Sequence, residues 1–150
     1  MVISLLPKKH NWNTVSFTST LYLYPVLDLL LANIPSEWQP EIRLGLQEAL
    51  VNAAKHGNRL DPSKTVMVEY SSIEEKYFWV ISDEGSGFVP NCNCDRLPDL
   101  DLPPENSESG RGLCILHQIF DKVRWNKTGT QLSLCKKINP KSSNNRPILI

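Results

Sequence analysis

The sequence predicts an α/β (α+β) two-layer sandwich, in which a mostly antiparallel mixed sheet is covered by helices on one face. Apolar and polar residues alternate in the short segments 14–20, 65–72 and 76–83, as they do in half-buried strands. Two longer segments, 21–34 and about 37–56, instead place apolar residues at helical spacing. The order strand, helix, helix, hairpin, helix, hairpin is typical of a sheet with helices packed on one side.

Length and composition indicate a single domain over residues 1–150, with a core at about 14–137 and a polar, mobile tail at 138–150. The 16 basic and 16 acidic residues balance, so no overall field attracts nucleic acid or an anionic membrane. No apolar run reaches the ~20 residues that span a bilayer. The start, MVISLLPKKH, lacks the pattern of a secretory signal, and we therefore expect a cytoplasmic protein.

The four cysteines do not have the spacing of a zinc site, which requires paired ligands. Cys114 and Cys135 lie in apolar segments and are expected to be small buried side chains. Cys92 and Cys94 lie in a loop, where the pattern leaves redox chemistry and metal binding open. We expect reduced thiols in a cytoplasmic chain.

The two longer helices have recognisable ends. Pro25 must either fall in the first turn of the first helix or kink it, and Pro40 fits only in the first turn of the second. Ser36 is expected to be the N-cap of the second helix. Gly57 stands where a left-handed C-terminal cap is expected.

The second half contains a long segment without periodicity, from Gly85 to Ser109, with prolines and acidic residues throughout. A loop of this length inside a compact domain is typically a functional lid or disordered. A helix is predicted at about 111–121, and the segments KVRWNK and TQLSLCKK are predicted to close the sheet as a pair of strands.

The second helix carries a polar stripe. Glu48, Asn52 and His56, within EALVNAAKHGN, recur every four residues and therefore lie one above another on a helix. On a lone helix such a stripe is a solvated edge. Because it borders the apolar face, the carboxylate and the amide could instead line a cleft. The helix by itself leaves both interpretations open.

Glycines gather in two short motifs. In SDEGSGF, Gly85 and Gly87 follow a strand and would let the chain turn at the floor of a pocket. Asp83 ends that strand, where its carboxylate could accept a hydrogen bond from an exocyclic amine such as that of adenine. The glycines of SESGRGL precede the predicted helix, whose free N–H groups suit phosphate. Each motif alone is more often structural, but their combination with the polar stripe is more specific.

These motifs resemble those of the ATPase superfamily that includes gyrase B, heat-shock chaperones, sensor histidine kinases and the mismatch-repair protein MutL. EALVNAAKHGN is similar to the N-box of that superfamily, DEGSGF to its first glycine box, ESGRGL to its second and GTQL to its closing segment near the adenine. Within the superfamily the chain is most similar to the bacterial anti-sigma-factor serine kinases, whose helix has the same Glu-Ala-x-x-Asn pattern. The resemblance covers roughly Thr14 to Lys137.

The resemblance implies ATP and Mg²⁺ as cofactors and assigns roles to residues. Glu48 would be the general base, and Asn52 would bind Mg²⁺ through its side-chain oxygen without adding negative charge beside the phosphates. For Lys55 and Arg111, a solvent-facing position fits equally well. The predicted nucleotide contacts are Asn52, Lys55, Asp83, Gly85, Gly87, Gly110, Arg111, Gly112, Leu113 and Thr130.

The activity implied is that of a protein serine/threonine kinase that phosphorylates an anti-sigma-factor antagonist and sequesters a sigma factor. The resemblance also suggests a homodimer, formed through the N-terminal strand and first helix. The loop at 90–109 would be the ATP lid, although its Cys-x-Cys and its run DRLPDLDLPPEN match no known part. The alternative is an ATP-binding regulatory module or switch kinase without a sigma factor. Glu48 favours the enzyme, because a pure binder needs no base.

Overall fold

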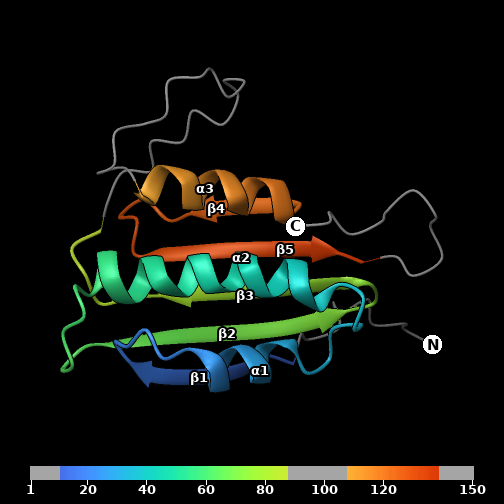
Figure 1. Cartoon of the computed structure of the whole chain (residues 1–150), viewed down its shortest axis with the longest axis horizontal. Coiled ribbons are helices and arrows are strands. Elements are labelled where there is room, and N and C mark those ends of the chain that lie inside the picture. The colour runs from blue at the N-terminus through green and yellow to red at the C-terminus, as the bar shows by residue number, and fades with distance from the viewer. Residues whose placement is uncertain (1–10, 88–107, 139–150) are drawn as a thin grey trace, which may run out of the picture.

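A five-stranded antiparallel sheet forms one layer of the protein, and helices form the other (Figure 1). The computed structural model describes residues 11–87 and 108–138, without the side chains of 108–111. The spatial order of the strands is β1-β2-β3-β5-β4. Their bounds are β1 Asn13–Thr18, β2 Thr65–Ile73, β3 Lys76–Ser82, β4 Lys122–Trp125 and β5 Gln131–Lys137.

The register of the strands places one row of apolar side chains under the helices. Val68 of β2 pairs with Ile81 of β3, and Ile81 pairs with Leu132 of β5. All three side chains are buried, as expected when alternate residues of a strand face the core. Every pair of strands in the described part is antiparallel, so the predicted fold class is confirmed and its sheet contains no parallel pair there.

The helices all cover the same face of the sheet, with α2 between α1 and α3 (Figure 1). Pro25 and Pro40 lie in the first turns of α1 and α2, as predicted, where a missing N–H costs no helical hydrogen bond. The bounds are α1 Tyr24–Leu31, α2 Gln39–Val51, the π-helical turn η1 Asn52–Gly57, and α3 Glu108–Ile119.

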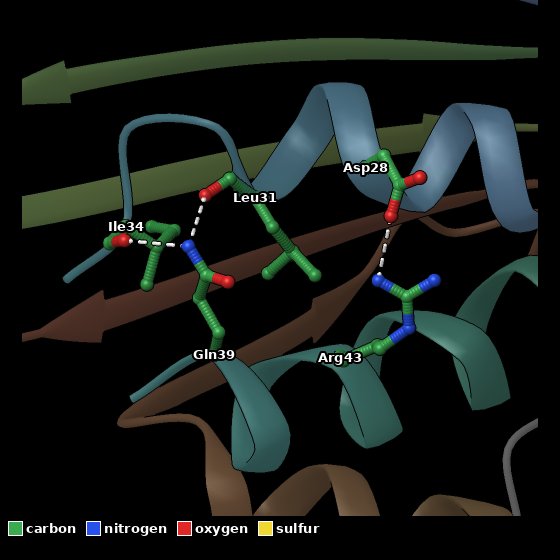
Figure 2. A network of polar contacts seen from close by, with 5 residues as sticks. All are labelled: Asp28, Leu31, Ile34, Gln39 and Arg43. Atoms are coloured by element: carbon green, nitrogen blue, oxygen red, sulfur yellow. Dashed lines mark hydrogen bonds and ion pairs between the residues drawn. The ribbon is translucent and has the colours of Figure 1, made fainter. Parts of the chain in front are cut away.

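The start of α2 is tied to the end of α1 by a side chain (Figure 2). The amide of Gln39 donates hydrogen bonds from Nε2 to the carbonyl oxygens of Leu31, at 3.2 Å, and Ile34, at 2.9 Å. The N-cap position of α2 is Trp38, and no side chain caps the helix there. The prediction of Ser36 as the N-cap is therefore wrong, because a turn intervenes between that serine and the first helical residue.

The second predicted helix is two elements, because its last turn is π-helical. Asn58 N–H bonds to the carbonyl of Ala53 at 2.9 Å, five residues back, as π-helical turns do. In the described part, the positive φ values near this end belong to Arg59, at 53°, and Leu60, at 56°. The left-handed cap predicted at Gly57 is therefore wrong.

A glycine lets α2 and α3 approach each other closely. A Cβ at Gly45 would lie 2.6 Å from Cε2 of the Phe120 ring, so this position has no room for a side chain. The same ring meets Trp79 of β3 edge-on, with centroids 5.7 Å apart. This contact places the residue after α3 against the middle of α2, and the first turns of α3 lie beside later residues of α2.

Several predictions concern parts of the chain outside the described residues. These parts contain residues 90–107 of the lid predicted at 90–109, together with Cys92 and Cys94, and residues 139–150 of the tail predicted at 138–150. Glu108 and Ser109, the last two residues of the predicted lid, instead lie in α3. Ile138, the first residue of that predicted tail, is buried and bonds through its N–H to the carbonyl of Glu75 at 2.8 Å.

Of the two described cysteines, Cys135 is buried and Cys114 is partly buried, in line with their predicted packing role. Burial raises the pKa of the Cys135 thiol, which keeps it protonated and unreactive. Within residues 11–87 and 108–138, no group of three or more histidine, cysteine, aspartate or glutamate side chains could hold a metal ion. None of the helices described there is long and apolar enough to cross a membrane.

Candidate functional site

The polar stripe of the sequence ends at Asn52 in the structure. Glu48 is partly buried and Asn52 is buried, whereas Lys55 and His56 are exposed, because the π-helical turn changes the angular spacing of the residues that follow. Within the described part, neither the Glu48 carboxylate nor the Asn52 amide forms a side-chain hydrogen bond or ion pair. Buried amides are normally hydrogen-bonded, so an amide without a protein partner indicates a place for a ligand.

Gly112 of α3 lies directly against this pair. A Cβ at position 112 would lie 3.0 Å from Oε2 of Glu48 and 3.6 Å from Nδ2 of Asn52. The lack of a side chain at Gly112 therefore lets the two helices bring the carboxylate and the amide beside the backbone of α3. Gly110 and Gly112 lie inside α3, which begins at Glu108, so the prediction that they precede the helix is wrong.

Gly57, at the end of η1, faces the turn that follows β3. A Cβ on Gly57 would lie 2.5 Å from Cγ of Asp83, so glycine is required here by a tertiary contact. A Cβ on Gly85 would in turn overlap the carbonyl oxygen of Gly57. Gly85 also donates its N–H to Oδ1 of Asp83 at 2.8 Å. The turn after β3 and the end of η1 therefore fit together only through these two glycines.

Asp83 is partly buried by this arrangement. Its burial raises the pKa of the carboxyl above the ordinary value, against the opposing effects of the Gly85 N–H and the Lys64 charge. A partly desolvated carboxylate gains more from a new hydrogen-bond donor than one in water. Asp83 is therefore suited to accept a hydrogen bond from a ligand.

The segment predicted to close the site lies beside Asp83. The N–H of Asp83 bonds to the carbonyl of Thr130 at 2.9 Å, and Thr130 N–H bonds to Oδ1 of Asn126 at 3.0 Å. Gly87 has a φ of 84°, and a Cβ there would overlap the carbonyl oxygen of Thr128. A positive φ and a close backbone approach both require glycine at this position.

The structure brings most of the predicted site residues into two groups. Glu48, Asn52 and Gly112 meet between α2 and α3, while Asp83, Gly85, Gly87 and Thr130 meet at the end of β3. The side chain of Leu113 is 3% exposed and belongs to the hydrophobic core. Lys55 is exposed, and the side chain of Arg111 lies outside the described part.

Sequence reasoning missed the residues that hold these groups in place. Asn58, Glu84 and Asn126 all hydrogen-bond to segments of the site, and Gly45 sets the distance between α2 and α3. Asn126 could have been found, because asparagine three residues before a glycine, here Gly129, is typical of a type I turn. Asn58 and Glu84 have no such signal, because their partners lie far away along the chain.

The sequence also matches that of known proteins. Residues 27–136 match the family described as histidine kinase-like ATPase domain. The chain belongs to this family. Membership in it implies that the protein binds ATP, as predicted from the glycine boxes.

Known relatives in this family are proteins named anti-sigma F factor. The chain is 30% identical over 102 residues to that of Clostridium perfringens (strain SM101 / Type A), which covers 66% of this chain and 72% of the relative. It is 32% identical over 101 residues to that of Anoxybacillus flavithermus, covering 65% and 68% of the two chains. It is 31% identical over 83 residues to that of Geobacillus stearothermophilus, covering 55% and 56%. The resemblance inferred from the Glu-Ala-x-x-Asn pattern is therefore confirmed.

Proposed function

We propose that this chain is an ATP-dependent protein serine/threonine kinase that acts as an anti-sigma factor. The observation that supports it best is the juxtaposition of Glu48 and Asn52 with Gly112, in a protein of an ATPase family. Phosphoryl transfer to a hydroxyl uses a general base and a ligand for the metal ion. The Glu48 carboxylate and the Asn52 amide would supply these two groups beside the backbone of Gly112. The proposal treats residues 14–137 as one catalytic domain.

In this proposal Glu48 is the general base. The hydroxyl oxygen of a partner's serine or threonine attacks the γ-phosphorus of ATP, and its proton passes to the Glu48 carboxylate. The bond from the γ-phosphorus to the β–γ bridging oxygen breaks, and ADP leaves. Phosphoryl transfer depends mainly on positioning and charge stabilisation, and a general base contributes about 10²–10⁴-fold to the rate.

Asn52 would hold the Mg²⁺ that accompanies ATP. Its side chain is 8% exposed and has no hydrogen-bond partner within the described part, so its oxygen is available to a ligand. An amide oxygen is a hard, neutral donor of the kind that Mg²⁺ accepts together with phosphate oxygens and water. When bound, Mg²⁺ would neutralise charge on the triphosphate. Asp83, Gly85 and Gly87 would bind the adenine end, and Gly110, Arg111, Gly112, Thr130 and Lys55 would complete the nucleotide contacts.

The protein partners in this proposal are a sigma factor and an antagonist protein that supplies the phosphoacceptor hydroxyl. The name shared by the relatives, anti-sigma F factor, supports the first of these. The balanced charge of the chain, with 16 basic and 16 acidic residues, gives no reason to expect direct nucleic-acid binding. A cytoplasmic location is part of the same proposal, because sigma factors act on RNA polymerase.

The proposal is tested by transfer from labelled Mg-ATP to candidate antagonist proteins. Glu48→Gln should lower transfer by about 10²–10⁴-fold while ATP affinity stays within about threefold. Glu37→Gln, a change at an exposed position before α2, is the matched control and should transfer normally. Full transfer by Glu48→Gln would disprove the base assignment. A wild-type protein that binds ATP but transfers to no candidate would favour the regulatory-module alternative.

A homodimer through the N-terminal strand and first helix is also proposed. β1 is an edge strand of the described sheet, and unpaired edges are sites of strand addition. Exposed apolar side chains cluster in and just before α1, and these are Leu21, Tyr22, Tyr24 and Leu29. Sedimentation of the wild type should show a dimer, and Tyr22→Asp should shift it to monomer. A wild type that is monomeric at high concentration would exclude the dimer.

A further inference from the structure

A buried asparagine connects three segments next to the candidate adenine site. The side chain of Asn58 is 0% exposed. Its Nδ2 donates to Oγ of Ser19 and to the carbonyl of Thr65, both at 2.9 Å. Its Oδ1 accepts the N–H of Glu84 at 2.7 Å. Both amide hydrogens and the carbonyl oxygen thus have partners, which offsets the cost of burying this polar side chain.

The partners of Asn58 bracket the contact between Asp83 and Gly57. Asn58 follows Gly57 directly in the chain, and Glu84 follows Asp83 directly. The 2.7 Å bond from Glu84 N–H to Asn58 Oδ1 therefore holds the two chain segments at the place where the Asp83 carboxylate abuts the Gly57 backbone.

The side chain of Glu84 adds a second connection between the same segments. Its Oε1 accepts hydrogen bonds from Thr65, from the N–H at 3.0 Å and from the hydroxyl at 2.6 Å. The carbonyl oxygen of Thr65 also accepts a hydrogen bond from Nδ2 of Asn58, so Asn58, Glu84 and Thr65 form a closed triangle of hydrogen bonds. A closed triangle restricts rotation of the turn after β3 more than a single bond would.

We propose that Asn58 is a positioning residue that fixes the Asp83 carboxylate for recognition of an exocyclic amine, and so sets selectivity for adenine nucleotides. This inference rests on the proposed function, in which Asp83 accepts a hydrogen bond from the adenine. Asn58 itself does not touch the base. It acts by holding the turn that begins with Asp83 against the end of η1.

A purely structural role for Asn58 makes a different prediction. Asn58→Ala would leave the hydroxyl of Ser19, the carbonyl of Thr65 and the N–H of Glu84 without this partner, so stability should fall in either case. Base selectivity, however, should change only if Asp83 loses its position. The relevant quantity is therefore the ratio of affinities for two nucleotides that differ at the exocyclic amine.

The test compares Mg-ATP with Mg-inosine triphosphate, which has a carbonyl oxygen in place of the amine. Binding is measured by calorimetry on the full chain, well below the unfolding midpoint of each variant. We expect the wild type to prefer ATP by about tenfold or more, the value of a hydrogen bond to a charged acceptor. Asn58→Ala should reduce this preference by about tenfold. An unchanged preference in folded Asn58→Ala would overturn the inference.

Two further variants control for lost stability and for failure of Asn58→Ala to fold. Gln39→Ala also removes two side-chain bonds to backbone carbonyls, but at the opposite end of α2, and should keep the full preference for ATP. A reduced preference in Gln39→Ala would show that lost stability alone has this effect, and would overturn the inference. If Asn58→Ala does not fold, Thr65→Val removes the exposed hydroxyl bond to Glu84 and should reduce the preference by about two- to fivefold. No change in Thr65→Val would then overturn the inference.

The outcome also separates this inference from the proposed function. A wild type that binds neither nucleotide would overturn the proposed function itself. A wild type that binds both equally would remove the amine-recognition role of Asp83, and the inference with it. Tight, ATP-selective binding that is insensitive to Asn58 would overturn the inference alone.

Discussion

The two ends of the segment formed by α2 and η1 place polar side chains in opposite settings. At the start, Gln39 donates two hydrogen bonds from its side-chain amide to backbone carbonyls (Figure 2). The buried Lys136 ammonium lies 3.9 Å from Glu41 of α2 and donates to the carbonyl of Ile119 at 2.7 Å. Towards the end, Glu48 and Asn52 have no side-chain hydrogen bond within the described part. The polar groups of the first end join elements of the fold, whereas Glu48 and Asn52 are proposed to bind a ligand.

The difference shows how one continuous helical segment serves both stability and chemistry. Unpaired polar groups are costly when buried, so the end that keeps them needs support from elsewhere. That support comes from Asn58, whose side chain donates two hydrogen bonds and accepts one just beyond η1, and from Gly112, which makes room for Glu48 and Asn52. The residues proposed to bind a ligand and the residues that hold them in place are therefore close in the chain but chemically distinct.

The largest effect in this comparison is expected on Mg-ATP affinity, from a change at Asn52. Asn52→Ala should weaken Mg-ATP binding by at least about 10–100-fold, since even outer-shell groups of metal sites have effects of that size. The loss should disappear when the same titration is done with ATP and a chelator, because the amide oxygen acts through the ion. Equal affinities of wild type and variant for Mg-ATP would contradict the assignment of Asn52.

The next largest effect is expected when a methyl group is added to one glycine in each half of the segment formed by α2 and η1. Gly45→Ala would place Cβ 2.6 Å from the Phe120 ring, and Gly57→Ala would place it 2.5 Å from the Asp83 carboxyl carbon. Each should cost about 1–3 kcal/mol of unfolding free energy through overpacking. Only Gly57→Ala should also reduce the preference for ATP over inosine triphosphate. Denaturant unfolding and calorimetry together measure the two effects, and equal loss of preference in both variants would erase the distinction between the halves.

A smaller effect is expected from pH. Because burial raises the pKa of Asp83, its carboxylate should protonate at a higher pH than an ordinary aspartate. The preference for ATP should therefore fall as pH falls through that raised pKa, since a protonated carboxyl is a poorer acceptor. The contribution of Asp83 to folding stability changes with pH in the opposite direction. Because the native state binds the proton more tightly than the unfolded state, this contribution is present at low pH and is lost as pH rises through the raised pKa.

Calorimetry with both nucleotides between neutral and acidic pH measures this change. Asp83→Asn serves as the control, because it removes the titrating group and reveals only the titration of the nucleotides themselves. If the preference for ATP depended on pH in the same way in the wild type and in Asp83→Asn, Asp83 would not be the group that binds the amine.

The smallest effect is expected at the exposed ion pair of the first end. Arg43 Nη1 lies 2.8 Å from Oδ1 of Asp28 (Figure 2), and the same guanidinium lies 5.0 Å from the centre of the Tyr24 ring. Asp28→Asn should lower the free energy of unfolding by about 0–1 kcal/mol, the range for surface pairs, and salt should reduce the difference. ATP affinity should not change. A loss above about 2 kcal/mol would contradict this reading of a surface pair.

Much of the fold and part of the site could be predicted from local patterns. Alternating strands and the prolines in the first turns of α1 and α2 depend on neighbouring residues, and the structure confirms the elements that they indicated. Of the two glycine motifs, the first follows β3 as predicted, whereas Gly110 and Gly112 of the second lie inside α3. The cap at Ser36 and the left-handed glycine at Gly57 were wrong, because a local rule cannot detect the turn before α2 or the carboxylate of Asp83 beside the glycine.

The amino-acid sequence alone determined the type and order of the elements, because periodicity, proline geometry and glycine freedom act over a few residues. It also determined which residues could do chemistry. Only the tertiary structure decided which of them meet, since Asn58 reaches Glu84 across 26 positions and Ser19 across 39. The same packing decided that Glu48 and Asn52 share one face with Gly112, because close contact between helices depends on both partners.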